Sequence, residues 1–239
     1  MNFESVSRTH VGLRRKINED SLFADPGHGL WVVADGMGGH EAGEVASMMV
    51  TDALRCLPPF RDTEELAAKV VEALHRVHLE LVELAGSDGR DKSRTIGTTV
   101  VGLAIEAGAY CCFWAGDSRA YRLRAADITR VSRDHSLVQN LVDAGMLRAE
   151  EADTHENANL ITRAVGVGEK FDVDIVRGDA RPGDQFLLAS DGLTRLVNDA
   201  ELAVELSSGP LDQVADTLIE TVLSRGAPDN VSLIIVKVL

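Results

Sequence analysis

Apolar residues follow two periodicities along this chain, one typical of strands and one typical of helices. Short apolar runs bounded by Gly, Pro or Asp predict strands. We expect them at residues 3–12, 21–24, 30–35, 97–108, 109–118, 120–127, 128–132, 171–180, 184–192 and 230–238. Most of the connections are short, which favours antiparallel pairing because parallel neighbours need long crossovers.

A three- and four-residue spacing of apolar side chains predicts the helices. It is clearest at 64–85, where one face carries Leu66, Val70, Leu74, Val77, Leu81 and Leu84. Further helices are expected at 41–57, 199–206 and 211–224, and the polar segment 136–165 also has a helical pattern. Strands and helices in separate blocks predict an α+β layered fold rather than a doubly wound parallel sheet.

Composition and charge narrow the classes of protein. The chain has 239 residues, 45% of them hydrophobic, and no Pro/Ser-rich linker, so we expect a single domain, residues 1–239. A formal charge of −14 with no basic patch argues against a nucleic-acid or membrane partner. No apolar run could cross a bilayer and the first thirty residues carry no secretory pattern, so we expect a cytoplasmic protein.

Four predicted strands meet an aspartate at one end. Three strands run into Asp35, Asp117 and Asp191, and the last strand begins just after Asp229. In antiparallel sheets these ends can lie side by side, so the four carboxylates can converge on one edge. Such carboxylates repel one another unless protons or cations are present, and an oxygen-only set of ligands favours Mg²⁺ or Mn²⁺. A lone Asp-Gly is more often a turn, and Asp35 by itself could cap a helix that begins near Glu41.

Glycines are concentrated directly after Asp35, in the stretch LWVVADGMGGHEAGE at 30–44. Because glycine has no side chain, the backbone there can approach a metal ion closely and offer a carbonyl oxygen. Two more carboxylates, Glu19 and Asp20, stand just before a strand in RRKINEDSLF.

Seven stretches follow one another in a characteristic order: RRKINED, VVADGMGGHEAG, GTT, AGDSRAYRL, DHSLVQ, LLASDGLT and PDNVSLIIV. This order resembles the metal-dependent protein Ser/Thr phosphatases of type 2C, the PPM family, in their small bacterial form. The resemblance covers residues 3 to 237. It implies a four-layer α-β-β-α sandwich with two central antiparallel sheets, and a flap at 136–165. It also implies hydrolysis of phosphoserine and phosphothreonine through in-line attack by a water bridging two metal ions.

The resemblance implies which residues hold the two Mn²⁺ or Mg²⁺ ions. Asp35 bridges both ions, Asp191 and Asp229 complete the first, and the carbonyl of Gly36 serves the second. The ions would also turn a cluster that repels phosphate into one that attracts it.

Further positions follow from the same resemblance. Glu19 and Asp20 hold metal-bound waters around the ions. Asp117 together with Asp191 resembles a weaker third-metal site. Asn230 orients the neighbouring metal ligand through hydrogen bonds outside the coordination sphere.

Two residues are candidates for contacts with the substrate. Arg15, five residues before Asp20, aligns with the family's phosphate-binding arginine, although Arg14 and Lys16 beside it also fit a plain solvated basic face. His40 either protonates the leaving alkoxide or lies at a helix start, and the sequence leaves both open.

Two rival functions stay open at this point: a non-catalytic relative that binds phosphoproteins, and a metal-dependent phosphodiesterase. The three costly carboxylates Asp35, Asp191 and Asp229 argue against a pure binding protein. The net charge of −14 argues against a nucleic-acid substrate. We expect phosphoprotein substrates, including a bacterial Ser/Thr kinase or its targets, and a monomer.

Overall fold

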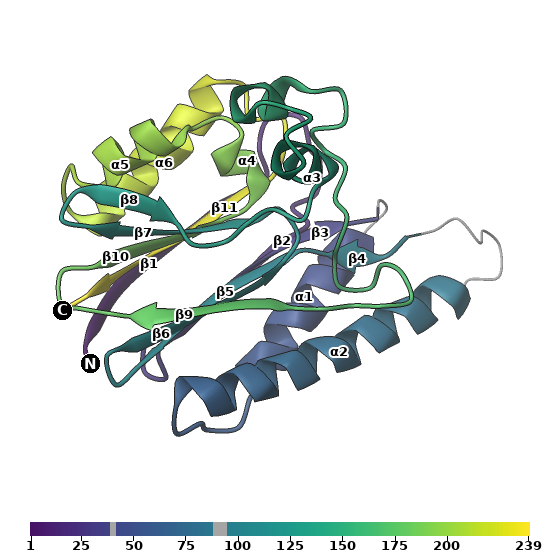
Figure 1. The fold of residues 1–239 in the computed structure, drawn as a ribbon, viewed down its shortest axis with the longest axis horizontal. Helices are drawn as coiled ribbons and strands as arrows, with labels where there is room; N and C mark the ends of the chain where they lie inside the picture. The colour runs from purple at the N-terminus through teal and green to yellow at the C-terminus, as the bar shows by residue number, and fades with distance from the viewer. Residues whose placement is uncertain (39–41, 88–94) are drawn as a thin grey trace.

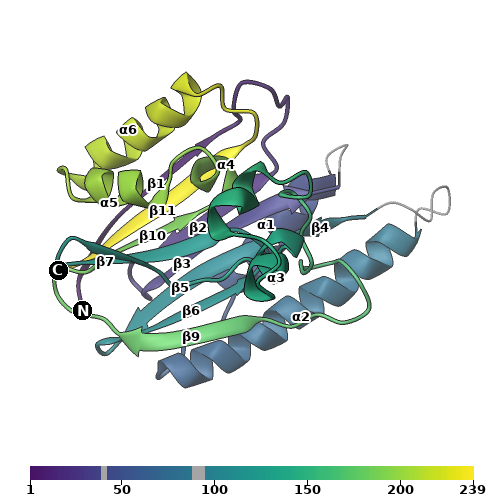
Figure 2. The same cartoon turned by 45° about the horizontal axis from the view of Figure 1, so that its top comes forward.

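The computed structural model describes residues 1–38, 42–87 and 95–239. Within these ranges two antiparallel sheets lie face to face, and helices cover the outer face of each sheet (Figures 1 and 2). This arrangement confirms the expected α+β sandwich with α-β-β-α layers. No helix of the described ranges combines the length and the apolarity needed to cross a membrane.

The first sheet joins the two ends of the chain. Its strands, in spatial order, are β1 (Phe3–His10), β11 (Val231–Val238), β10 (Gln185–Ala189), β7 (Arg119–Arg124) and β8 (Asp127–Arg130). Because β10 and β11 pair antiparallel, the C-terminal end of β10 lies beside the N-terminal end of β11.

The second sheet has the spatial order β2, β3, β5, β6, β9, with β4 paired to the end of β3. The strands are β2 (Asp20–Asp25), β3 (Leu30–Met37), β4 (Gly97–Thr98), β5 (Val100–Glu106), β6 (Ala109–Ala115) and β9 (Asp174–Asp179). Both β3 and β6 pair antiparallel with β5, so their C-terminal ends lie at the same edge of the sheet.

Helices from different parts of the chain cover the two sheets. The second sheet is covered by α1 (Ala42–Arg55) and α2 (Thr63–Ser87), and the first by α4 (Asp191–Thr194), α5 (Asp199–Leu206) and α6 (Leu211–Ser224). Near α4 lie α3 (Leu137–Asp143) and the 3-10 helix η1 (Ala149–Thr154) (Figure 1).

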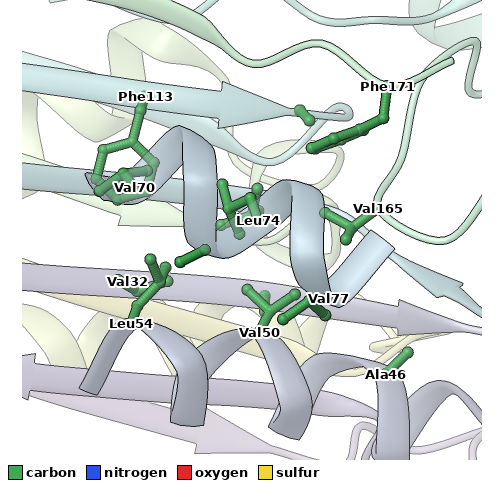
Figure 3. Close-up of a cluster of buried hydrophobic side chains, with 14 of the residues drawn as sticks. Val32, Ala46, Val50, Leu54, Val70, Leu74, Val77, Phe113, Val165 and Phe171 are labelled. Carbon is green, nitrogen blue, oxygen red and sulfur yellow. The ribbon is translucent and has the colours of Figure 1, made fainter. Parts of the chain in front are cut away.

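Apolar side chains fill all three spaces between the four layers. On β3, Trp31 and Val33 face the other sheet whereas Val32 faces the helices, as the alternation of a strand requires. Figure 3 shows Val32 in the same buried cluster as Val50 of α1 and Leu74 of α2. Strands buried on both faces explain why the sequence shows continuous apolar runs instead of simple alternation.

The helices expected at 64–85, 199–206 and 211–224 are confirmed as α2, α5 and α6, with α2 longer at both ends. The strand expected at 97–108 is instead interrupted at Thr99. At this position the backbone N–H of Thr99 donates a hydrogen bond to Asp35 near the end of β3, and this splits the strand into β4 and β5.

The expectation that 136–165 is helical is only partly right. The structure forms α3 and η1 there, and the remaining residues are irregular. Gly145 stops the helical path because its backbone is left-handed, with φ of 68°. The segment then returns to its own start through an isolated bridge between Ser136 and Ile161.

Candidate active site

The acidic edge is the region where the strand ends bring together Asp20, Asp35, Asp117, Asp191 and Asp229. Asp20 and Asp35 form its centre. They are directly opposite each other in the antiparallel pair of β2 and β3, so their side chains share one face. Burial raises the pKa of Asp20 to about 6, although Ser190 Oγ donates a hydrogen bond to its Oδ2 at 3.0 Å. Burial, followed by the charge of Asp20, raises the pKa of Asp35 well above the usual range. Both carboxyls therefore favour a proton or a cation.

The backbone around Asp35 is fixed by two threonines. The Thr99 hydroxyl accepts the N–H of Asp35 at 3.2 Å, and the Thr99 N–H donates to the Asp35 carbonyl at 2.9 Å. The Thr98 hydroxyl donates to the same carbonyl at 2.9 Å. These bonds are the reason why the predicted strand breaks at Thr99.

Asp191 and Asp229 come from the neighbouring ends of β10 and β11. Asp191 is the first residue of α4, a short helix that the sequence did not predict, and Ser190 before it is tied to Ser232 by an N–H to carbonyl bond of 3.0 Å. Burial raises the pKa of Asp191, and Arg195 opposes that rise. Asp229 Oδ1 accepts the N–H of the next residue at 2.8 Å.

Asp117 stands at the end of β6 and is only 5% exposed. Burial and then the charge of Asp191 raise its pKa to about 7. Arg195 Nη2 lies 3.2 Å from Asp117 Oδ2 and 2.9 Å from Asp191 Oδ2. No motif of the sequence points to Arg195, because its helical spacing from Asp191 has meaning only when α4 is known.

Gly36 is required by the close approach of three chain segments. A Cβ built on Gly36 would lie 2.1 Å from the Gly43 carbonyl oxygen and 2.5 Å from the Glu19 carbonyl oxygen. The Gly36 N–H donates to that same Glu19 oxygen at 3.1 Å. No other residue fits there without moving backbone, which explains the glycine directly after Asp35.

Glu19 and Asn230 organise the loop that precedes β2. Asn230 Oδ1 accepts the N–H of Glu19 at 2.8 Å, and its amide donates to the carbonyls of Val11 at 2.8 Å and Ile17 at 3.0 Å. The Glu19 carboxylate accepts the N–H of Gly43 in the first turn of α1 at 3.2 Å. Glu19, rather than Asp35, thus contacts the start of that helix.

Arg15 lies on the loop that Asn230 holds. Its Nη2 is 2.7 Å from Asp229 Oδ2, and its side chain is 52% exposed. His40 falls outside the described residues.

A cavity of about 370 Å³ brings most of these residues together. Its lining includes Arg15, Glu19, Asp35, Gly36, Asp117, Asp191, Arg195 and Asp229, together with residues 159–164 of the segment that starts at Ser136. A larger cavity of about 770 Å³ shares Asp117, Asp191 and Arg195 with it and extends between α3 and α5. Asp20 and Asn230 are not among the residues that line the first cavity.

The donor set fits a hard divalent cation because every candidate ligand is an oxygen. Asp20 Oδ1 is buried without a hydrogen-bond partner, which a cation would satisfy. No three His, Cys, Asp or Glu side chains of the described ranges are already arranged as a metal-binding group. Arg15 and Arg195 instead pair with Asp229, Asp191 and Asp117, so metal binding would require these pairs to loosen or share their oxygens.

Comparison with known proteins gives consistent matches along the chain. Residues 13–230 match the family described as Protein phosphatase 2C. Serine/threonine protein phosphatase PstP of Mycobacterium tuberculosis is 36% identical over 233 residues; the match covers 98% of this chain and 44% of PstP, so the chain spans less than half of that relative's length.

Solved protein structures give matches of the same kind. The structure described as PppA, a key regulatory component of T6SS in Pseudomonas aeruginosa, is 40% identical with a TM-score of 0.91 and covers 100% of this chain and 99% of that one. The catalytic domain of serine threonine protein phosphatase PstP in complex with 2 manganese ions is 34% identical with a TM-score of 0.87, covering 98% and 97%.

Proposed function

Because this chain belongs to the protein phosphatase 2C family, we propose that it is a metal-dependent phosphatase acting on phosphoserine and phosphothreonine in proteins. The observation that carries the proposal is the convergence of Asp35, Asp117, Asp191 and Asp229 with Arg15 on one cavity. Four carboxylates that share an edge can hold divalent cations, and such cations together with the arginine suit a site that neutralises and holds a phosphoryl group.

We propose that two Mn²⁺ or Mg²⁺ ions are held by Asp35, Asp191, Asp229 and the Gly36 carbonyl, with Asp20 holding water bound to the ions. When bound, such ions lower the pKa of a water and offset the negative charge of the phosphoryl group. Manganese in the solved PstP domain supports this choice of ion. The chain's own contribution is to hold the oxygen donors in place: Thr98 and Thr99 fix Asp35, and Ser190 fixes Asp20.

Arg15 is the proposed contact to the phosphoryl oxygens. A guanidinium presents parallel N–H donors and stays charged at every relevant pH. The three hydrogen bonds between Asn230 and the loop before β2 hold Arg15 at the cavity. We assign proton donation to the leaving alkoxide to His40, on the sequence alone.

We further propose that residues 1–239 act as one catalytic unit, with 136–165 as a flap that contacts the substrate. Residues 159–164 line the cavity, which supports this assignment. The proposed setting is the cytoplasm, with a monomer acting on a Ser/Thr kinase or its targets. The neighbour described as a regulatory component of T6SS makes secretion control a pathway to test.

The deciding experiment measures turnover of a phosphothreonine peptide with Mn²⁺, with chelator, and beside a phosphodiester. We expect turnover of the peptide only, lost on chelation and lost in Asp35→Asn. Asp127→Asn, at the exposed start of β8, is the matched control and should keep full activity. Peptide binding without turnover would instead favour a binding protein, and diester cleavage would favour a phosphodiesterase.

A further inference from the structure

Arg195 connects two aspartates that belong to different sheets. Its Nη2 donates a hydrogen bond to Asp117 Oδ2 at 3.2 Å and lies 2.9 Å from Asp191 Oδ2. Asp117 follows β6 of the second sheet and Asp191 follows β10 of the first. A single guanidinium therefore bridges the carboxylate pair that resembles a third-metal site.

The short helix α4 fixes the position of this arginine. Arg195 follows Asp191 by one helical turn, and its N–H donates to the Asp191 carbonyl at 2.9 Å. Residues four apart lie on the same side of a helix, so the side chain returns to the Asp191 carboxylate. A guanidinium cannot lose its proton in a protein, so the positive charge there is permanent.

Asp117 has little freedom to turn away from Arg195. The residues on either side of it are both fixed: the Gly116 N–H donates to His135 Nδ1 at 3.1 Å, and Ser118 Oγ lies 2.7 Å from Thr99 Oγ1. With only 5% of Asp117 exposed, its carboxylate favours a proton or a cation inside this site.

We propose that Arg195 is the resident cation of the Asp117–Asp191 pair and replaces the third metal ion, so that this chain binds two ions instead of three. The inference rests on the proposed function, because it concerns the same acidic centre. A divalent ion placed between these carboxylates would stand beside a fixed positive charge, and the two like charges would repel each other. The expected third metal site at Asp117 and Asp191 is thus replaced by a site that Arg195 occupies.

A metal ion is not kept away from Asp117 and Asp191 by a lack of access from solution. Arg195, Asp117 and Asp191 line both cavities, of about 370 and 770 Å³, so an ion from solution can reach them. Charge therefore decides between Arg195 and a metal ion, and changing that one charge should change the number of ions bound.

Titration calorimetry with Mn²⁺ on the chelator-stripped full chain counts the ions. We expect two ions for the unchanged protein. Arg195→Gln should bind a third ion, with affinity at that site raised roughly tenfold or more by the loss of the adjacent charge. Arg195→Gln combined with Asp117→Asn should return to two ions, because the pair that holds the third ion is then gone.

Two control variants separate a charge effect from a structural one. Arg195→Lys keeps the positive charge and should keep two ions. Arg225→Gln removes the same charge from the lining of the larger cavity, where Arg225 pairs with Glu201 at 2.6 Å, and should also keep two ions. A third ion in either control would overturn the assignment to Arg195.

The outcomes also distinguish this inference from the proposed function. Three ions in the unchanged protein, with the third unaffected by Arg195→Gln, would overturn the inference alone. No Mn²⁺ binding at all would overturn the proposed function and the inference with it. If Arg195→Gln does not fold, Asp117→Asn decides: an unchanged count of two supports the inference, and the loss of an ion overturns it.

Discussion

Arg15 Nη2 lies 2.7 Å from Asp229 Oδ2, so the proposed phosphate-binding arginine is paired with a proposed metal-holding carboxylate. This contact raises the pKa of Arg15, with the Asp229 hydrogen bond as the largest cause. A cation at Asp229 would weaken the pair and free N–H donors of Arg15 for a phosphoryl group. Metal binding and phosphate binding are therefore expected to be coupled through these two residues.

Arg15→Ala should weaken inhibition by inorganic phosphate by about 10–100-fold, the range expected for loss of a charge-assisted hydrogen bond worth about 1.5–3 kcal/mol. Its affinity for Mn²⁺ should hold or rise, because Asp229 loses a competing partner. Phosphate inhibition and Mn²⁺ calorimetry measure the two effects. Arg14→Ala is the matched control for an adjacent, exposed arginine. Equal effects in both variants would show a plain basic surface.

Without metal, the protein should lose stability as pH rises from about 4 to 7. The pKa of Asp20 is raised to about 6 and that of Asp117 to about 7, chiefly by burial. A carboxyl whose pKa is higher in the folded state stabilises the fold below its unfolded pKa, near 3.8, and loses that contribution as pH passes its folded pKa. Each such group changes the free energy of unfolding by up to about 1.4 kcal/mol per pH unit, or roughly 3 °C in Tm.

Melting temperatures with chelator at pH 5 and pH 7.5 check this decline. His78 and His135, whose pKa values are lowered by burial, act in the opposite direction, so the comparison between variants is the decisive one. Asp117→Asn should flatten the decline, whereas the exposed Asp127→Asn should leave it unchanged. Saturating Mn²⁺ should remove most of the decline in melting temperature with rising pH. A decline that is the same in all variants would place its cause outside the acidic edge.

Gly36→Ala should destabilise the protein by about 1–3 kcal/mol or more, because its Cβ would overlap the Gly43 and Glu19 carbonyl oxygens. It should also weaken Mn²⁺ binding, since the backbone next to Asp35 must move. Gly86→Ala in α2 meets nothing within 4 Å and should be neutral or slightly stabilising. Chemical denaturation measures both. A Gly36→Ala protein as stable as Gly86→Ala would contradict the tight crossing.

His40→Ala should cripple turnover of a phosphopeptide while largely sparing a nitrophenyl phosphate. Serine and threonine leave as strongly basic alkoxides that need a proton, and a positioned acid contributes about 10²–10⁴-fold. Nitrophenolate leaves without one. Turnover of both substrates, with Mn²⁺ affinity as the control, makes the comparison. Equal losses would indicate a structural or metal-positioning histidine, and no loss would indicate a residue that only starts a helix.

Local patterns were enough to predict the layers and the acidic edge. The alternation at Trp31, Val32 and Val33 and the helical spacing in α2 depend only on neighbouring residues, so the sequence contains them. Antiparallel strands with short connections must bring opposite ends together, and this places Asp191 beside Asp229 at the neighbouring ends of β10 and β11.

The partners of those carboxylates were decided by tertiary packing. Arg15 and Asp229 are 214 positions apart, and Arg195 meets Asp117 across 78 positions and two sheets. Nothing in the local pattern specifies which of several charged residues will meet when two sheets stack. Burial raises the carboxyl pKa values only after that stacking has removed water. The sequence therefore determined where negative charge collects, and the packing of the two sheets decided which cations of the chain already hold it.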